Sequence, residues 1–538
     1  MTKSPFWVVL LVCLLTQLIP ITSVGQTVTM EYNQPITGME GLYFWYADAS
    51  KPVALFNRNI TPKENCFVII NGYAFLSWYK GGMQNRDLMV SRMKLGTNNW
   101  VTVQLPYKNT LYNVVKDGID YSQSPAGDSH RTISIGVSAK DGTIHLVFDQ
   151  HAGDLNYVVS KKNIAFADDT DFVASNFLPI RNYFKAGYPI TSCTYPNFIT
   201  NKAGELVLNY RNGTSRQGDT MGLYYDGNGW SSVYNIVEGN NVPQQFFLYG
   251  GLSYQNDELY LSGSIRIYGS QTEYNQGCYL AKCIGQRGNE NWLTNTGISY
   301  PIPLSNLLTA FMLAEPLANP TQDMTSPASF VLSTNKTMHF TGSVSGLGTI
   351  HFYGKNNNTE IVRSTSNAPA SVSFAAGERV FATRSVASTG RFVISSTDQN
   401  SSSWRDDLSF TPPSKFENMV SYVYEGKLYM VASEYKNSDK HPFRFLVFDL
   451  GLPKTTGVDK TLANSKLPII STNKSSHTCI DLKSFQNAEI KVFNLLGTEV
   501  LRIKEASGVL PLELPKGYYI VDVNHNGIRI ETNKTLIL

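Results

Sequence analysis

The segment Asp141-Gly-Thr-Ile-His-Leu-Val-Phe148 places a tight Asp-Gly turn before a short strand with alternating apolar residues. The same combination of turn and strand recurs along the chain, at 71–78, 203–210, 256–261 and 425–431, with a looser copy at 348–353. Short alternating strands bounded by Gly, Asn and Asp turns are typical of sandwiches, barrels and propellers. Long amphipathic helical patterns are nearly absent from the sequence. We therefore predict an all-β fold.

A second repeated element is a strand followed by a polar turn that closes on a tryptophan, at Trp100, Trp230, Trp292 and Trp404. Such a Trp can pack against the outer strand of one sheet and hold it in place, while the polar residues of the turn form hydrogen bonds with the turn's own backbone groups. The element resembles the Asp-box repeats of sialidase-like proteins in a degenerate form. Repeats of roughly 50 to 70 residues are in the range of elaborated propeller blades. The sequence thus predicts a seven-bladed β-propeller, with two stacked β-domains as the alternative.

The two ends of the chain predict separate segments. Residues 1–25 combine Lys3, an apolar run over 6–19 and small residues near Gly25, which is the layout of a cleavable signal peptide. The run is short for the alternative, a membrane anchor. We expect the propeller over 26–459, a polar linker over 460–480 and a small C-terminal β-sandwich over 481–538.

The C-terminal segment contains three distinctive stretches, Ala488-Glu-Ile-Lys-Val-Phe-Asn-Leu-Leu-Gly497, Leu514-Pro-Lys-Gly-Tyr-Tyr-Ile-Val521 and Lys534-Thr-Leu-Ile-Leu538. Together they resemble the C-terminal sorting domain of the type IX secretion system. The resemblance implies a Bacteroidetes-type source, the type IX secretion machinery as a partner and release to the cell surface or the medium. A small substrate-binding module is the alternative.

Composition excludes several classes of function. The chain has 45 Lys and Arg against 42 Asp and Glu, a net charge of +3, and contains no basic block that would favour nucleic acid. We expect a secreted monomer without a membrane span in the mature chain. After loss of the signal peptide five scattered cysteines remain, which form no disulfide framework. Cys278 and Cys283 indicate core positions or one local bridge.

Two histidines lie at matching ends of neighbouring predicted strands. His130 precedes the strand 132–137, and His151 follows the strand 143–148. If these strands pair antiparallel, the start of one and the end of the next share one edge of the sheet. The same argument places Tyr195 and Arg211 together at one end of the following blade. The sequence therefore predicts that all four side chains converge near the propeller axis.

This set resembles the propeller-fold polysaccharide lyases, which include ulvan lyases and enzymes that cut rhamnose–glucuronate linkages in plant gums. The resemblance rests on the separation of the two histidines, 151 − 130 = 21, and of Tyr195 from Arg211, 211 − 195 = 16. It also rests on Thr-Tyr-Pro-Asn-Phe at 194–198 and Tyr-Arg-Asn-Gly at 210–213. Two departures, Arg131 in place of Asn and Ser-Ile-Arg-Ile at 264–267 in place of a Trp-Arg-Glu motif, concern expected substrate contacts.

The resemblance implies that the enzyme removes the C5 proton of a uronic acid and expels the 4-linked sugar. Arg211 would neutralise the carboxylate. His130 and Tyr195 would form the base and acid pair, because a His with a pKa of about 6.5 accepts a proton at mild pH. Tyr195 would serve as the base instead if Arg211 lowers its pKa from about 10. His151 would position substrate or add a second positive charge.

The candidate contacts to substrate are Arg131, Arg216, Arg266 and Asn197. The expected substrate is an anionic, sulfated polysaccharide such as ulvan. No cofactor is required, and a structural calcium or zinc ion is possible but has no ligand signature. The alternatives are a gum lyase, a sialidase-like hydrolase, which needs a carboxylate in its cleft, and a noncatalytic carbohydrate-binding propeller.

Overall fold

The computed structural model of the chain divides into two compact units, Met1–Leu452 and Pro453–Leu538. The residues that the structure describes are 27–46, 52–54, 65–82, 85–110, 115–116, 119–120, 126–128, 130–214, 217–239, 246–268, 273–305, 310–314, 324–344, 348–355, 358, 360–364, 372–452, 469–472, 478–482, 488–494, 498–507, 509–511, 514–515, 517–525 and 528–537. The predicted signal peptide, 1–25, lies outside these residues.

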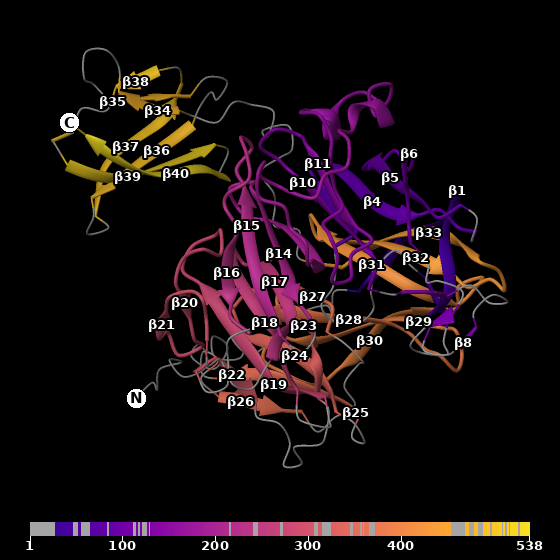
Figure 1. The fold of residues 1–538 in the computed structure, drawn as a ribbon. Coiled ribbons are helices and arrows are strands. Elements are labelled where there is room, and N and C mark those ends of the chain that lie inside the picture. Colours follow the sequence, from indigo (N-terminus) through magenta and orange to yellow (C-terminus); the bar gives the residue numbers. More distant parts are fainter. Residues whose placement is uncertain are drawn as a thin grey trace, which may run out of the picture. The chain divides into compact units, whose positions relative to one another are not determined.

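The described part of the first unit contains a two-stranded sheet and seven larger sheets, which are antiparallel except for one β1–β9 pair and which we call blades 1 to 7 (Figure 1). Blade 1 is β3 (Phe67–Ile70), β4 (Tyr73–Tyr79), β5 (Asp87–Lys94) and β6 (Trp100–Lys108). Blade 2 is β10 (Ile133–Val137), β11 (Ile144–Phe148) and β12 (Tyr157–Val159). Blade 3 is β13 (Thr194–Thr200), β14 (Leu206–Gly213), β15 (Gly218–Tyr225) and β16 (Tyr234–Val237).

The remaining blades complete the first unit. Blade 4 is β17 (Phe246–Gln255), β18 (Glu258–Tyr268), β19 (Glu273–Cys283), β20 (Trp292–Leu293), β21 (Ser299–Tyr300) and β22 (Met312–Ala314). Blade 5 is β23 (Met324–Leu332), β24 (Met338–Val344), β25 (Gly348–Lys355) and β26 (Glu360–Arg363). Blade 6 is β27 (Phe374–Ala376), β28 (Arg379–Ser385), β29 (Phe392–Asp398) and β30 (Arg405–Phe410).

Blade 7 joins the two ends of the first unit. It combines β31 (Phe416–Tyr424), β32 (Lys427–Glu434) and β33 (Lys440–Asp449) with β1 (Thr29–Tyr46), to which β2 (Pro52–Ala54) and β9 (Ala126–Gly127) attach. β1 pairs antiparallel with β33, from Thr29 opposite Asp449 to Leu42 opposite Lys440. In Figure 1 the indigo β1 accordingly lies beside the orange β33. This pairing closes the ring, because an N-terminal strand completes the blade formed by the last strands of the unit.

The smaller elements lie between the blades. They are the two-stranded pair β7 (Val115–Lys116) and β8 (Ile119–Asp120) and the short 3₁₀ helices η1 (Ile164–Phe166) and η2 (Ala174–Asn176). No helix among the described residues is long and apolar enough to span a membrane. The all-β propeller class predicted from the sequence is confirmed.

The alternating strands explain how neighbouring blades pack. Successive side chains of a strand point to opposite faces of its sheet. In β11, Leu146 packs into the core shared with blade 1, whereas Val147 packs into the core shared with blade 3. Leu208 and Val207 of β14 divide in the same way between blades 2 and 4. Each blade is therefore apolar on both faces, and the cores lie between blades.

The hairpin turns between the first and second strands of successive blades meet on one side of the propeller, which we call the turn face. Lys202 after β13 pairs with Asp257 after β17, with 2.5 Å between Nζ and Oδ2. Asn256 donates to the carbonyl of Ser333 after β23, and Thr334 donates to the carbonyl of Gly377 after β27. The opposite side, where first strands begin and second strands end, is called the site face below.

The second unit consists of two sheets in its described residues. One contains β34 (Ile469–Thr472), β35 (Thr478–Asp481) and β38 (Val509–Pro511), and the other contains β36 (Ala488–Asn494), β37 (Glu499–Ala506), β39 (Gly517–His525) and β40 (Ile528–Ile537). Leu510 of the first sheet packs against the buried Ile490, Val492 and Val521 of the second. The unit is thus built as two sheets around one core.

Two expectations change in detail. The segment 460–480 was expected to be a linker, but it contains β34 and the start of β35, since its Ile and Thr residues favour extended pairing. Cys278 and Cys283 are both buried and form no disulfide with each other. Burial raises the pKa of the Cys283 thiol to about 12, and Cys278 is buried in the core between blades 4 and 5.

Candidate active site

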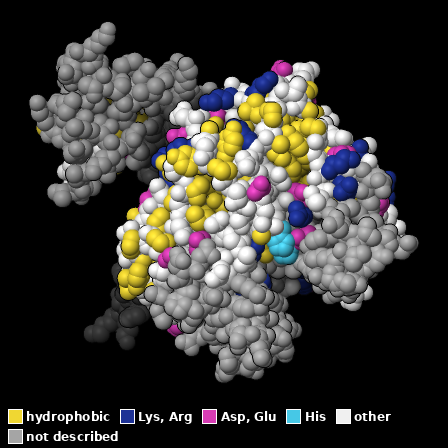
Figure 2. Space-filling view, viewed as in Figure 1, with side chains coloured by type: hydrophobic (Ala, Val, Ile, Leu, Met, Phe, Trp, Pro, Cys, Tyr) yellow, Lys and Arg dark blue, Asp and Glu magenta, His cyan; other side chains and the backbone are white. Residues whose placement is uncertain are grey.

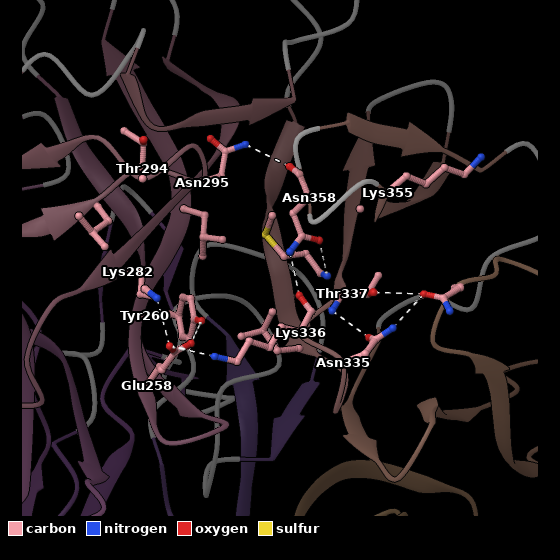
Figure 3. Close-up of a pocket in the computed structure, with 17 residues that line it drawn as sticks. Glu258, Tyr260, Lys282, Thr294, Asn295, Asn335, Lys336, Thr337, Lys355 and Asn358 are labelled. Atoms are coloured by element: carbon pink, nitrogen blue, oxygen red, sulfur yellow. Dashed lines mark hydrogen bonds and ion pairs between the residues drawn. The ribbon is translucent and has the colours of Figure 1, made fainter. Parts of the chain in front are cut away.

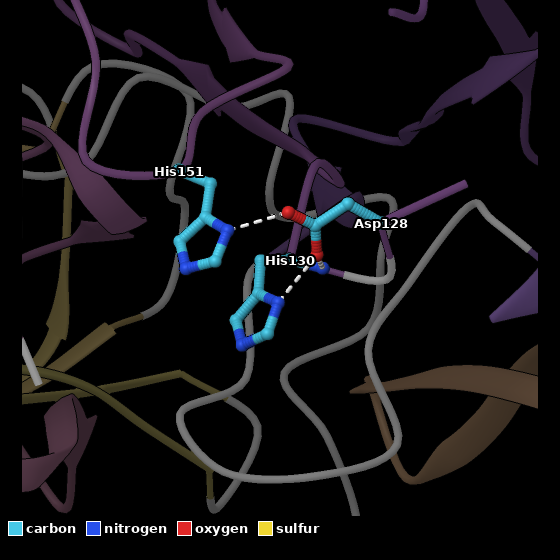
Figure 4. A group of neighbouring side chains, drawn as sticks. All are labelled: Asp128, His130 and His151. Carbon is cyan, nitrogen blue, oxygen red and sulfur yellow. Dashed lines mark hydrogen bonds and ion pairs between the residues drawn. The ribbon is translucent and has the colours of Figure 1, made fainter. Parts of the chain in front are cut away.

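Two histidines of blade 2 stack at the site face and share one carboxylate. β10 pairs with β11 so that Ile133 lies opposite Phe148, which brings the start of one strand beside the end of the other. The rings of His130 and His151 are parallel within 10°, with 4.0 Å between their centroids. Nδ1 of each ring lies 2.5 Å from a different oxygen of Asp128. In Figure 4 both Nε2 atoms lie on the sides of the rings away from Asp128.

The carboxylate of Asp128 is buried and remains ionised. Burial by itself would raise its pKa, but hydrogen bonds from both histidines and their charges outweigh burial and lower the pKa well below its usual range. An ionised carboxylate can only accept hydrogen bonds. Nδ1 therefore carries a proton on both rings, and Nε2 of a neutral ring is left as the proton acceptor.

Both imidazoles are accessible from outside. The side chain of His130 is 14% exposed and that of His151 is 31% exposed, whereas Asp128 is 1% exposed. Figure 2 shows histidine side chains, in cyan, at the surface of the molecule with basic side chains nearby. A ligand can therefore reach the imidazoles but not the carboxylate that holds them.

Tyr195 and Arg211 of blade 3 lie next to the two histidines. We call the four side chains of His151, His130, Tyr195 and Arg211 the active-site row. The Tyr195 ring lies 5.8 Å from the His130 ring, and the Arg211 guanidinium lies 5.0 Å from the centroid of the Tyr195 ring. Thr194 lies opposite Arg211 in the β13–β14 register. The structure thus brings together His151, His130, Tyr195 and Arg211, the four residues that the sequence singled out.

The hydroxyl of Thr194 joins the two blades at this row. It accepts hydrogen bonds from Nη2 of Arg211, at 3.0 Å, and from the backbone N–H of Ala152, at 2.7 Å. Tyr195 has a φ of +58°, and Ala152 has a φ of +50°. Left-handed backbone is uncommon for residues with a side chain and is held here by the surrounding contacts. Thr194 belongs to the Thr-Tyr-Pro-Asn-Phe stretch that carries the family resemblance, but the sequence did not indicate the role of its hydroxyl. Asp128 could have been found as a carboxylate two residues before a histidine.

Arg131 lies behind the row rather than in it. Its Nη1 lies 3.5 Å from Oδ1 of Asp149, and its Nε lies 3.8 Å from Oδ2 of Asp128. Burial raises the pKa of Asp149, although hydrogen bonds from Thr110 and the charge of Arg131 oppose the rise. The guanidinium of Arg131 thus faces two carboxylates, which is a supporting position.

The other predicted substrate contacts are placed differently. Asn197 is only 7% exposed, and its Nδ2 donates to the carbonyl of Leu252, so this side chain joins blades 3 and 4 instead of lining the site. The prediction for Asn197 missed this because the sequence does not show which strand neighbours β13. Arg266 lies near the end of β18, at the site face of blade 4. Arg216 lies outside the described residues.

Asp128, His130 and His151 are also the group of described residues that could offer ligands to a metal ion, with one ligand atom from each within 4.8 Å of the others. At 2.5 Å, the contacts between Nδ1 and the carboxylate oxygens are short hydrogen bonds, in which each ring nitrogen donates to a different oxygen of Asp128. Ligation of an ion by these same atoms would require loss of the Nδ1 protons. The donor set therefore fits a hydrogen-bonded triad better than a metal centre.

Gly218 supports the position of Arg211, which gives a first prediction. A Cβ at residue 218 would lie 2.7 Å from the carbonyl oxygen of Thr214 and 3.0 Å from Cγ and Cδ of Arg211. We expect Gly218→Ala to displace Arg211 and to lower the proposed activity about tenfold to a hundredfold. Steady-state kinetics test this, with Gly229→Ala, where a Cβ meets nothing within 4 Å, as the control. Equal activity of both variants would contradict the prediction.

The chain is similar to a family of BNR repeat-containing proteins and to curated ulvan lyases. A family model described as "BNR repeat-containing family member" matches residues 73–325, a range that contains all four residues of the row. The chain is 23% identical over 447 residues to "Ulvan lyase, long isoform" of Glaciecola sp. (strain KUL10), covering 74% of this chain and 43% of that protein. It is 22% identical over 456 residues to "Ulvan lyase, short isoform" of Alteromonas sp. (strain LOR), covering 74% and 84%. The chain spans about half the length of the long-isoform relatives that it matches.

Solved structures share the fold. The crystal structure of polysaccharide lyase Uly1 superimposes with a TM-score of 0.65 at 20% identity, covering 78% of this chain and 99% of that one. A PL25 ulvan lyase bound to -[GlcA(1-4)Rha3S]- gives a TM-score of 0.55 at 13% identity, covering 76% and 95%. At these identities the likeness concerns the propeller itself.

Proposed function

We propose that this chain is a polysaccharide lyase that cleaves ulvan, a uronate-containing anionic polymer, by β-elimination. The observation that carries the proposal is the row of His130, Tyr195 and Arg211, in which a proton acceptor, a hydroxyl donor and a fixed cation lie side by side. The names of the ulvan lyase relatives support the choice of polymer.

The reaction that we propose uses each group once. Arg211 binds the uronate carboxylate and offsets the charge that builds up on it as the C5–H bond breaks. Nε2 of His130 takes the C5 proton, and the electron pair forms the C4–C5 double bond as the C4–O4 bond breaks. The Tyr195 hydroxyl donates its proton to the leaving O4. The two products are a new nonreducing end with an unsaturated uronate and a sugar with a free reducing end.

His151 and Asp128 support His130 in this scheme. Asp128 fixes the proton of His130 on Nδ1, so Nε2 is available for the C5 proton. The carboxylate also stabilises the imidazolium that forms when the proton arrives. His151, stacked on His130 and more exposed, can donate to a carboxylate or sulfate oxygen of the substrate when it is protonated. An epimer that presents its C5 proton on the opposite face would exchange the roles of His130 and Tyr195.

The carboxylates near the row are engaged, which disfavours a glycoside hydrolase. Asp128 holds both histidines, and Asp149 accepts hydrogen bonds from Asn109 and from the backbone and side chain of Thr110. Most retaining and inverting hydrolases need two carboxyl groups that are free to reach the glycosidic bond, and a sialidase, which uses a Tyr nucleophile, still needs a free carboxylate in its cleft. Neither of these two buried carboxylates meets that requirement.

Incubation of the purified chain with ulvan tests the proposal. We expect the ultraviolet absorbance of unsaturated uronate and new reducing ends to increase together. Reducing ends without absorbance would establish a hydrolase, and binding without either signal would establish a noncatalytic propeller. Cleavage of a rhamnose–glucuronate gum but not of ulvan would show that the substrate is a plant gum.

Treatment with a chelator tests whether the triad works without a metal ion. We expect activity on ulvan to be unchanged after EDTA treatment and desalting, because Arg211 supplies the positive charge that a metal ion would otherwise supply. Metal content measured on the same sample is the control. A loss of activity that zinc or calcium restores would contradict the expectation.

We also propose export of the protein, from the sequence of residues 1–25 and 481–538. An intact polymer cannot enter a cell, so an enzyme that makes its first cut acts outside. Secretion through the type IX machinery is the proposed route, and a monomer is the proposed state. Expression in a type IX-competent host, with and without 481–538, tests the route, since the truncated chain keeps its signal peptide but should remain in the cell envelope and not reach the cell surface or the medium.

A further inference from the structure

A second pocket, separate from the active-site row, opens between blades 4, 5 and 6 on the turn face. Its volume is about 740 Å³, within the range of roughly 300 to 1,000 Å³ that is typical of ligand sites. Its walls come from the first turn of blade 5 and from the ends of β19, β25 and β29, with the start of β18 beside them. The active-site row lies at the opposite ends of such strands, so one sugar unit cannot occupy both sites.

The pocket carries an excess of positive charge. Glu258 accepts from Lys282 at 3.1 Å and from Lys336 at 3.2 Å through the same oxygen, and its other oxygen accepts from Tyr260 at 2.5 Å (Figure 3). Burial would raise the pKa of Glu258, but these hydrogen bonds outweigh burial and lower it, so the group is ionised. Lys355 is exposed, its Nζ lies 5.7 Å from the centroid of the Tyr353 ring, and it makes no ion pair with the described residues. The described lining thus holds three lysines and one carboxylate, 3 − 1 = +2.

Amide side chains in the pocket are fixed in position. Asn358 accepts from the backbone N–H of Met338 at 2.9 Å and donates to the carbonyl of Lys336 at 2.8 Å. Asn335 accepts from the N–H of Thr337 and donates to Asn400. Each amide keeps a further donor or acceptor position, so it can bind a hydroxyl group without a loss of side-chain entropy.

The floor of the pocket is apolar. Tyr260, Leu280, Leu332 and Met338 belong to one core cluster between blades 4 and 5 and are at most 6% exposed. A sugar ring has apolar C–H faces and polar edges, so it matches an apolar floor surrounded by amides. The lysines add a preference for sulfate or carboxylate substituents.

We propose that this pocket is a second saccharide-binding site, which binds an acidic stretch of the polysaccharide on the face opposite to the cleavage site. The identity of the saccharide rests on the proposed function. The site holds the enzyme on its polymer, because a chain bound at one face keeps neighbouring chains at high local concentration for the other.

Binding of sulfated ulvan oligosaccharides to the full-length chain carrying Arg211→Ala tests this site, because this variant should not degrade the probe. Lys355→Ala and Lys336→Asn are then added together. Asn suits position 336, where φ is +65°. We expect the two substitutions together to weaken binding of the oligosaccharide at this site at least tenfold, as measured by isothermal titration calorimetry. Lys162→Ala, also exposed but paired with Asp141 of blade 2, is the control and should leave binding unchanged.

The outcomes separate this inference from the proposed function. Unchanged affinity in the double-lysine variant would overturn the second site, even if wild-type protein cleaves ulvan. Equal binding of a neutral cello-oligosaccharide would overturn its acidic preference. Loss of binding in the double-lysine variant of a protein that fails to cleave ulvan would establish the saccharide site and reject the lyase. Thermal melting of each variant confirms that it is folded.

Discussion

Replacing Arg211 with Ala is expected to lower kcat/KM for ulvan cleavage by about a thousandfold or more. Arg211 is only 5% exposed, so its charge acts on a bound carboxylate with little screening by water. Without it, a uronate that already carries one negative charge must gain more as its C5 proton leaves. The initial rate of ultraviolet absorbance increase, measured over a range of ulvan concentrations, gives the value.

Two further arginine variants make this result specific. Arg211→Lys keeps the charge but loses the planar fork, so it should recover only part of the activity. Arg405→Ala removes an arginine that is 52% exposed on blade 6 and should leave activity unchanged. More than a tenth of the wild-type kcat/KM in a folded Arg211→Ala protein would rule out Arg211 as the neutralising residue.

Replacing Asp128 with Asn is expected to lower kcat by about a hundredfold to ten-thousandfold. An amide can donate a hydrogen bond as well as accept one, so it no longer holds the proton on Nδ1 of both His130 and His151. Part of the imidazole population then presents a protonated Nε2, which cannot take the C5 proton. The pH profile of kcat should also change, because the imidazolium loses its stabilising anion.

Asp128→Asn should also lower the free energy of unfolding, by an amount that depends on pH. The folded-state pKa of Asp128 lies below its value in the unfolded chain, so its stabilisation is present above about pH 4 and is lost as the pH falls towards the folded-state pKa. The difference in unfolding free energy between wild type and Asp128→Asn should therefore shrink below about pH 4. Denaturant titrations at several pH values measure it.

Asp141→Asn is the matched control for Asp128→Asn. Asp141 is another buried carboxylate of blade 2, but it lies in the β10–β11 turn, where it accepts from Tyr225 and Thr143. We expect Asp141→Asn to destabilise the fold and to leave the pH profile of kcat unchanged. An identical change of profile in both variants would mean that Asp128 acts only through general stability.

The convergence of the four site residues could be predicted because it depends on local rules. His130 and His151 flank two adjacent strands, and antiparallel pairing alone brings such residues to one edge. Tyr195 and Arg211 follow from the same rule in the next hairpin. Asn197 could not be assigned in this way, because its partner, Leu252, is 252 − 197 = 55 residues away in a different blade.

The sequence by itself determined the class of fold and the residues of the row, since period-two strands and their turns are encoded within a few residues of each other. Only the tertiary structure decided what those residues touch. Three features depend on how strands meet across a hairpin or between blades. They are the hydrogen bond from Ala152 to Thr194, the carboxylate shared by two histidines and the second pocket on the turn face. Most of those contacts join groups that are distant in sequence, such as His151 with Asp128 and Ala152 with Thr194, so the local pattern of strands and turns does not specify them.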